Sequence, residues 1–180
     1  MYAGRAVLRV SLARDDLRVV AINHTASSME HLLTAIRHDS THGICQQATE
    51  ISVAPDDHPG LPAASLDNPK PCALLFRGRL IHLLSQRDAT KLDWEQVGAE
   101  YIMESTGKMT TKATAGVHIT HGKAKKVLIS APSKDAPNVV YGVNHKEYNG
   151  DQDILSNASC TVSACALALS DTGSLMSLDF

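Results

Sequence analysis

The sequence predicts an α/β domain built on a doubly wound, mostly parallel sheet. Helical patterns alternate along the chain with short runs rich in β-branched residues, which is typical of parallel strands joined by helices. The centres of these runs are apolar, as expected of strands buried on both faces. Small or polar residues follow several of the runs, at the strand ends where such sheets bind their ligands. We assign residues 1–161 to this domain.

The first part of the chain predicts a helix, a strand and a second helix. Residues 4–13 carry valine and leucine at helical spacing, and residues 17–23 form a β-branched run that predicts a buried parallel strand. Ser27 and Glu30 match the capping-box pattern at the start of a helix. The apolar face of that second helix is expected to contain Met29, Leu32, Leu33 and Ile36.

The composition changes after residue 43. Residues 51–54 predict a strand, and residues 74–76 and 80–84 predict a hairpin around an Arg-Gly-Arg turn. Between them, residues 54–73 are rich in proline, and we interpret them as a surface insertion. A tolerated loop is the preferred reading of this insertion, and a regulatory segment is the alternative.

The last part resumes the alternation. A helix is expected from Thr110 or Thr111, as its capping residue, to His121, with Gly122 as its stop. Further strands are predicted at residues 101–103, 126–129, 139–141 and 153–155.

Composition excludes several classes of function. The net charge is −2, so the chain has no basic surface for nucleic acid or for an anionic membrane. No apolar run approaches the roughly 20 residues that cross a bilayer, and the N-terminus lacks the layout of a signal peptide. The four cysteines show no metal-ligand spacing. We therefore expect a cytoplasmic protein with no bound metal.

Residues 156–161 read Ser-Asn-Ala-Ser-Cys-Thr and contain the candidate nucleophile, Cys160. A strand-like run precedes this stretch and an Ala/Leu-rich segment with helical character follows it. Cys160 would thus lie near a helix N-terminus, where backbone N–H groups and the helix dipole stabilise a thiolate. A thiolate attacks carbonyl carbon. The alternative is a small buried hydrophobic residue, which is the commoner role of a lone cysteine.

Several motifs resemble those of phosphorylating glyceraldehyde-3-phosphate dehydrogenases, in the order and near the spacing of that family. They include Ser-Asn-Ala-Ser-Cys-Thr and Arg-His-Asp-Ser-Thr-His-Gly at residues 37–43. The others are Ala-Glu-Tyr-Ile-Met-Glu-Ser-Thr-Gly at 99–107, Ile-Ser-Ala-Pro-Ser at 129–133 and Gly-Val-Asn-His at 142–145. The resemblance implies a Rossmann-like domain for NAD or NADP.

The resemblance also assigns roles to single residues. Cys160 matches the catalytic thiol, and Ser159 and Thr161 match positions that contact the phospho-aldehyde or inorganic phosphate. The cofactor positions that it implies are Gly4, Asn23, His24, Arg87, Thr106, Gly107 and Ser130. The family usually has an aspartate where this chain has His24. A carboxylate repels the 2′-phosphate of NADP and imidazole does not, so either the preference for NAD is relaxed or other contacts preserve it.

The two ends of the sequence differ from the family. The resemblance begins at Gly4, so we expect this fragment to lack the family's first strand and the glycine turn after it, and strands on either side to keep unpaired edges. It stops at Thr161; residues 162–180 are expected to be an unrelated tail, and the catalytic domain to be absent. The family's thiol-activating histidine has no counterpart, because His118, His121 and His145 are expected to be solvated or capping residues.

Three functions follow from the resemblance. The first is an NAD(P)-dependent dehydrogenase that makes 1,3-bisphosphoglycerate in glycolysis and gluconeogenesis, whose family is homotetrameric. The second is a non-catalytic nucleotide-binding remnant, and the third is the same reaction on a related phospho-aldehyde such as erythrose 4-phosphate. We expect the chain alone to be inactive.

Overall fold

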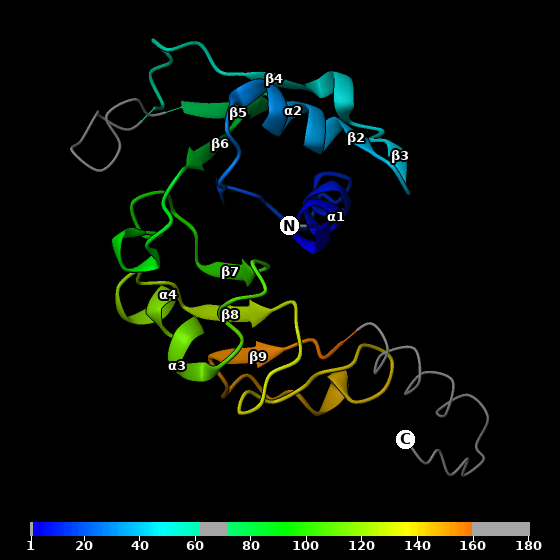
Figure 1. Cartoon of the computed structure of the whole chain (residues 1–180), viewed down its shortest axis with the longest axis vertical. Coiled ribbons are helices and arrows are strands. Elements are labelled where there is room, and N and C mark those ends of the chain that lie inside the picture. Colours follow the sequence, from blue (N-terminus) through cyan, green and yellow to red (C-terminus); the bar gives the residue numbers. More distant parts are fainter. Residues whose placement is uncertain (1, 62–71, 160–180) are drawn as a thin grey trace.

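The computed structural model describes residues 2–61 and 72–159, and the fold is mixed α/β with parallel strands (Figure 1). One sheet has the strand order β1-β6-β5-β4 and another the order β7-β8-β9, while β2 and β3 form a small hairpin. The strands are β1 (Ala21–Asn23), β2 (His38–Asp39), β3 (Gly43–Ile44), β4 (Ile51–Val53), β5 (Cys72–Phe76), β6 (Arg79–Leu84), β7 (Tyr101–Glu104), β8 (Lys126–Ile129) and β9 (Ile154–Ser156). The helices are α1 (Tyr2–Leu12), α2 (Met29–Arg37), α3 (Lys112–Ala115) and α4 (Val117–Thr120), with short 3-10 turns at Ala48–Glu50, Ala89–Lys91 and His145–Glu147.

The four-stranded sheet combines one parallel pair with an antiparallel meander. β1 runs parallel to β6, whereas β6, β5 and β4 pair antiparallel in turn. Arg77 and Gly78 connect β5 to β6, and both have positive φ values, 49° and 74°. Two such residues make the tight turn whose twist matches that of a hairpin, which confirms the predicted Arg-Gly-Arg turn.

The three-stranded sheet is parallel throughout. Glu104, Ile129 and Ser156 lie opposite one another at the carboxyl ends of β7, β8 and β9. The expected single sheet is therefore found as two main sheets, which Figure 1 shows at the two ends of the view.

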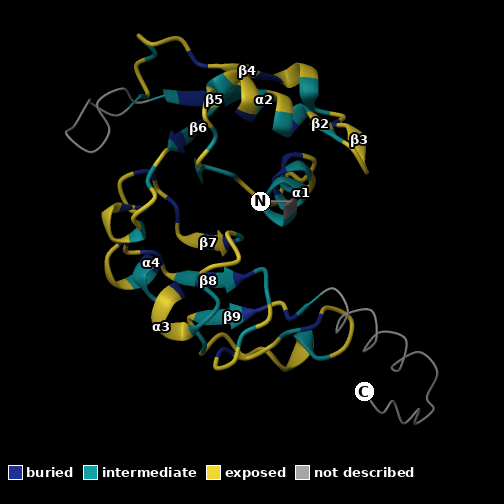
Figure 2. Cartoon of the chain, viewed as in Figure 1, coloured by how far each residue is buried: buried dark blue, intermediate teal, exposed yellow. Residues whose placement is uncertain are grey.

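The two sheets are separate because no strand pairs with both β1 and β7 in the described residues. Within the described ranges β1 pairs only with β6, and β7 only with β8, so each has one edge without a strand partner. β1 is consequently half-buried rather than fully buried. β7 is coloured mainly as exposed in Figure 2, and its Tyr101 and Met103 expose 70% and 37% of their surface. The expectation of unpaired edges on these two strands is thus confirmed.

Four predictions of local structure were wrong or misplaced. The strand predicted at residues 17–23 is reduced to the last three residues, and residues 139–141 form no strand, since Val139 only donates its N–H to Ser156. The helix predicted up to His121 is two short helices that meet at Gly116. The side chain of Ser28, not of Ser27, caps α2, by accepting from the N–H of His31. The remaining predicted helices and strands are confirmed within the described residues; only residues 54–61 and 72–73 of the predicted insertion are described, and the last two belong to β5.

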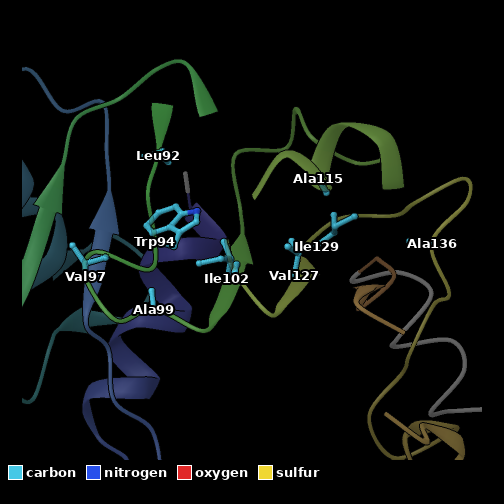
Figure 3. Close-up of a cluster of buried hydrophobic side chains, with 10 residues drawn as sticks. Leu92, Trp94, Val97, Ala99, Ile102, Ala115, Val127, Ile129 and Ala136 are labelled. Carbon is cyan, nitrogen blue, oxygen red and sulfur yellow. The ribbon is translucent and has the colours of Figure 1, made fainter. Parts of the chain in front are cut away.

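Two hydrophobic clusters hold the fold together. One joins α1 and α2 to the four-stranded sheet and centres on Ile36, Ile51 and Leu74. The other lies around the parallel sheet, where Figure 3 shows Ile102 between Trp94 and Val127. Ala21 of β1 and Leu84 of β6 also pack against this second cluster.

Truncation of Leu74 to alanine is expected to destabilise mainly the four-stranded sheet. Leu74 is 1% exposed, and removal of a buried leucine side chain costs about 2–5 kcal/mol through lost contacts and the cavity left behind. Because β1 and β7 share no ladder, hydrogen exchange should accelerate in β5 and β6 far more than in β8. The matched variant Val127→Ala should show the reverse pattern. Equal acceleration in both sheets after either change would show that they unfold as one unit.

Candidate functional site

Several predicted ligand-binding residues follow the carboxyl edge of β7-β8-β9. The ladder extends past the strands, since the N–H of Ser130 donates to Glu104 O at 2.9 Å and that of Asn157 to Ile129 O at 3.0 Å. Thr106 and Gly107 follow β7, Ser130 follows β8 and Ser159 follows β9. The structure thus places these four residues at one edge of a parallel sheet, where α/β proteins bind ligands.

Helix α1 brings Gly4 to the same edge. A Cβ atom on Gly4 would lie 3.2 Å from Cβ of Ser105, so the first turn of the helix packs closely against the segment after β7. The Oγ atom of Ser105 is buried and has no hydrogen-bond partner in the described part of the chain. The free N–H groups of a helix's first turn and a nearby hydroxyl group are suited to a polar or anionic ligand.

The Thr106–Gly107 turn is fixed by Glu104. One carboxylate oxygen of Glu104 accepts from the Thr106 N–H at 2.7 Å and from the Thr106 hydroxyl group. Gly107 has a φ of 75°, and no heavy atom lies within 4 Å of the place where a Cβ would sit. The turn therefore needs glycine for its backbone conformation and leaves open space beside it.

Glu104 belongs to a buried hydrogen-bonded chain that includes His118 and Trp94. Its second oxygen lies 3.0 Å from Nε2 of His118, and Nδ1 of His118 accepts from Nε1 of Trp94 at 3.1 Å. Glu104 and His118 are only 4% and 2% exposed. Burial alone would raise the pKa of Glu104, but the hydrogen bonds from His118 and Thr106 outweigh it and hold that pKa below its usual range.

Sequence reasoning missed this network and misjudged His118. The expectation of a solvated or capping histidine was wrong for His118, because it is buried between Glu104 and Trp94. It is confirmed for His121, which is exposed, and for His145, whose Nδ1 accepts from the Gly142 N–H. A signal was present in β7, where strand alternation places Glu104 on the same inward face as Ile102.

The remaining cofactor candidates lie at the carboxyl edge of β1 and β6. The amide group of Asn23 donates to and accepts from the backbone of Gln86, both at 2.9 Å, and so ties these two strand ends together. Nδ1 of His24 accepts from the Ala26 N–H, and partial burial lowers the pKa of His24. Its imidazole is thus neutral at pH 7. Arg87 is exposed in the loop after β6.

The segment that leads to the candidate nucleophile is held tightly. Ser156 is fully buried, and its hydroxyl group donates to Ala131 O at 2.7 Å and accepts from the Ala158 N–H at 3.0 Å. Ala158 has a φ of 61°, a left-handed conformation that is strained for a residue other than glycine. Ser159 is described and half-buried, whereas Cys160 and Thr161 lie outside the described residues.

Sequence comparison identifies the relatives of the chain. It is 42% identical over 163 residues, 91% of its length, to cytosolic glyceraldehyde-3-phosphate dehydrogenase of Taxus baccata, of which it covers 43%. It is 40% identical over the same share to glyceraldehyde-3-phosphate dehydrogenase of Ogataea parapolymorpha, and 39% to a chloroplastic one of Arabidopsis thaliana, covering 43% and 34% of them. The chain is a glyceraldehyde-3-phosphate dehydrogenase homologue. It spans about two fifths of the length of the relatives that it matches, a domain-length region, and no protein-family model matches it.

This homology implies a Rossmann-like NAD-binding domain, consistent with the parallel strands of both sheets. The described residues contain no cluster of histidine, cysteine and carboxylate side chains that would hold a metal ion. No helix within the described ranges is long and apolar enough to cross a membrane. A cavity between the end of α1 and the β5–β6 hairpin, lined by Leu12, Arg18 and Phe76 among others, lies apart from the candidate residues.

Proposed function

We propose that this glyceraldehyde-3-phosphate dehydrogenase homologue binds NAD or NADP at the edge where α1 meets the segment after β7. The observation that carries the proposal is the packing of Gly4 against Ser105, so close that a Cβ atom added to Gly4 would lie 3.2 Å from Cβ of Ser105. It brings the N-terminus of an 11-residue helix beside the carboxyl end of a parallel strand. A helix N-terminus at such an edge is suited to the phosphates of a dinucleotide.

The arrangement of the strands supports a more detailed proposal for how the dinucleotide lies in this site. We infer that the two main sheets are halves of one doubly wound sheet, with the unpaired edges of β1 and β7 facing each other across its centre. Asn23, His24 and Arg87 would then bind the adenosine end of the ligand, while Thr106, Gly107 and Ser130 bind the remainder. The neutral imidazole of His24 carries no negative charge that would repel the 2′-phosphate of NADP, so the site accepts both NAD and NADP.

The reaction that we propose for the whole protein is phosphorylating oxidation of glyceraldehyde 3-phosphate. The Cys160 thiolate adds to the aldehyde carbon, and loss of hydride turns the adduct into a thioester on sulfur. Bound NAD(P) supplies the hydride acceptor. Inorganic phosphate then displaces the thiolate to release 1,3-bisphosphoglycerate, with Ser159 and Thr161 contacting the phosphate groups.

Cellular setting and assembly follow the same homology. The names of the relatives describe cytosolic and chloroplastic enzymes, and we propose a cytoplasmic enzyme of glycolysis and gluconeogenesis that forms a homotetramer. We propose no nucleic-acid or membrane partner. Erythrose 4-phosphate, a related phospho-aldehyde, is the alternative substrate.

A non-catalytic nucleotide-binding protein is the second candidate function. It is favoured by the state of the histidines in the same half of the chain as Cys160. Both ring nitrogens of His118 are engaged within the core, and His121 and His145 each use Nδ1 in local hydrogen bonds. Titration of the purified chain with NAD and NADP tests nucleotide binding, which both candidates share, and turnover by a whole protein that contains this chain separates them.

Replacement of His24 by aspartate is expected to raise the preference for NAD over NADP by roughly tenfold or more. The new carboxylate would accept from ribose hydroxyl groups and repel a 2′-phosphate, and like charges a few Å apart repel by at least about 1 kcal/mol. The measurement is the ratio of the two dissociation constants by calorimetry. His24→Asn, which adds no charge, is the control and should leave the ratio near that of the wild type. An unchanged ratio in His24→Asp would remove residue 24 from the nucleotide site.

A further inference from the structure

The buried chain from Trp94 to Thr106 has a fixed order of donors and acceptors. The indole Nε1–H of Trp94 can only donate, so Nδ1 of His118, 3.1 Å away, must be unprotonated. The proton of the neutral imidazole is therefore on Nε2, from which it is donated to Glu104 at 3.0 Å. Glu104 completes the chain as an acceptor on both oxygens, because its other oxygen receives the N–H and the hydroxyl group of Thr106.

Burial of a carboxylate in this network costs free energy of solvation that an apolar side chain would not lose. A carboxylate that is 4% exposed loses most of its hydration, and apolar side chains of similar volume often stabilise a core at least as well. What apolar side chains would not do is hold the two donors of Thr106. The network connects the Thr106–Gly107 turn to α4 and to the loop that contains Trp94, segments that are otherwise distant in sequence.

We propose that Glu104 is a positioning residue of the nucleotide site, which holds the Thr106–Gly107 turn in its binding conformation, and that His118 and Trp94 orient its carboxylate. The proposal rests on the proposed function for the identity of the ligand. The ordering of the turn itself is independent of that function, since it is a property of the unliganded chain. Glu104 need not touch the ligand; it acts through Thr106 and Gly107.

The chemistry of the network distinguishes conservative changes from one another. In Glu104→Gln the shape is kept, but the amide group presents NH₂ either to His118 Nε2–H or to the donors of Thr106, so two donors face each other. In His118→Gln the amide N–H₂ can still donate to Glu104 while the contact with Trp94 is lost. Trp94→Phe removes the outermost donor and replaces the indole by a smaller aromatic ring. The expected order of damage to the turn is therefore Glu104→Gln first, then His118→Gln, with Trp94→Phe least.

The first test uses the unliganded 180-residue chain and nuclear magnetic resonance. Trp94 is the only tryptophan, so its indole N–H gives a single resonance. We expect the ¹⁵N shifts of His118 to show a protonated Nε2 and a bare Nδ1. In Glu104→Gln, exchange of the Thr106 amide proton should accelerate at least tenfold and the indole resonance should shift. In the control Val127→Ala, a core change in the same sheet, the exchange ratio of Thr106 to its β8 neighbours should stay as in the wild type.

The second test titrates NAD and NADP into the same variants under conditions where all are folded. Glu104→Gln should weaken binding at least tenfold, His118→Gln should bind within a few fold of the wild type, and Val127→Ala should bind like the wild type. Equal affinities of Glu104→Gln and Val127→Ala would overturn the positioning role. If the wild type binds neither nucleotide, the proposed function fails. Hydrogen exchange of the Thr106 amide then still tests whether Glu104 orders the Thr106–Gly107 turn. Unchanged Thr106 exchange in Glu104→Gln would overturn that ordering, and with it the proposal.

Discussion

Replacement of Glu104 by leucine is expected to lower the free energy of unfolding by about 3–5 kcal/mol. The change leaves the Nε2–H of His118 and both donors of Thr106 facing a side chain that accepts nothing. Three hydrogen bonds to a charged group are lost, each worth about 1.5–3 kcal/mol, while relief of the burial of the carboxylate itself offsets part of that loss. His118 is 2% exposed and so has no route to solvent without local unfolding. The measurement is urea denaturation at pH 7, followed by the fluorescence of Trp94.

A double-mutant cycle supplies the control. If the cost comes from polar groups left without partners, Glu104→Leu combined with His118→Leu should lower the free energy of unfolding by less than the two single changes added together.

The dependence of stability on pH gives a second control. Because the folded-state pKa of Glu104 lies below its unfolded value, its contribution is present above the unfolded pKa and is lost as the pH falls through the folded pKa. The Leu variant should lack this acid-dependent loss, and identical acid profiles of the two proteins would contradict the assignment of the charge to Glu104.

The regular elements were predictable where a local pattern decides them. The apolar spacing of α1, the turn at Arg77–Gly78 and the β-branched runs of β7 and β8 each favour the observed structure within a few residues. The predictions fail where a neighbouring strand, rather than the local sequence, determines whether a segment forms a strand. Residues 17–20 have strand composition but continue a strand that pairs on one side only within the described ranges, so most of the run remains irregular.

The candidate site was predictable in part for the same reason. Thr106, Gly107, Ser130 and Ser159 follow strands, and parallel register alone places strand ends together. The Glu104–His118–Trp94 chain was not predictable, because it joins three segments through side-chain contacts across 14 and 24 residues. The sequence around His118 does not indicate that its side chain is buried. Only the inward position of Glu104 on a strand indicated that a buried partner was required.

The 180-residue chain, expressed by itself, is expected to show no oxidation of glyceraldehyde 3-phosphate. A thiol needs a base to become a nucleophile and to relay the proton, a contribution of typically 10²–10⁴-fold. Of the histidines in the same half of the chain as Cys160, His118 is sequestered by Glu104 and Trp94, while His145 accepts from Gly142 and stacks on Tyr141 with ring centroids 4.5 Å apart. The chain also matches only 43% of its yew relative, so groups in the rest of such an enzyme that orient the aldehyde are not supplied.

The assay is the appearance of NADH absorbance with NAD, aldehyde and phosphate, for the wild type beside Cys160→Ser. Nucleotide binding is measured on the same samples, so that an inactive but correctly folded chain is distinguished from one that has lost its cofactor site. Equal, background rates for the two proteins with intact NAD binding are the expected result. They would locate the deficit in the chemistry at the thiol, because the cofactor would be bound and its acceptor function available. Turnover that depends on Cys160 would instead mean that a residue of this chain, or of a second copy, serves as the base. The first residues to replace would then be His121 and His145, since the local hydrogen bond of each histidine uses Nδ1 rather than Nε2.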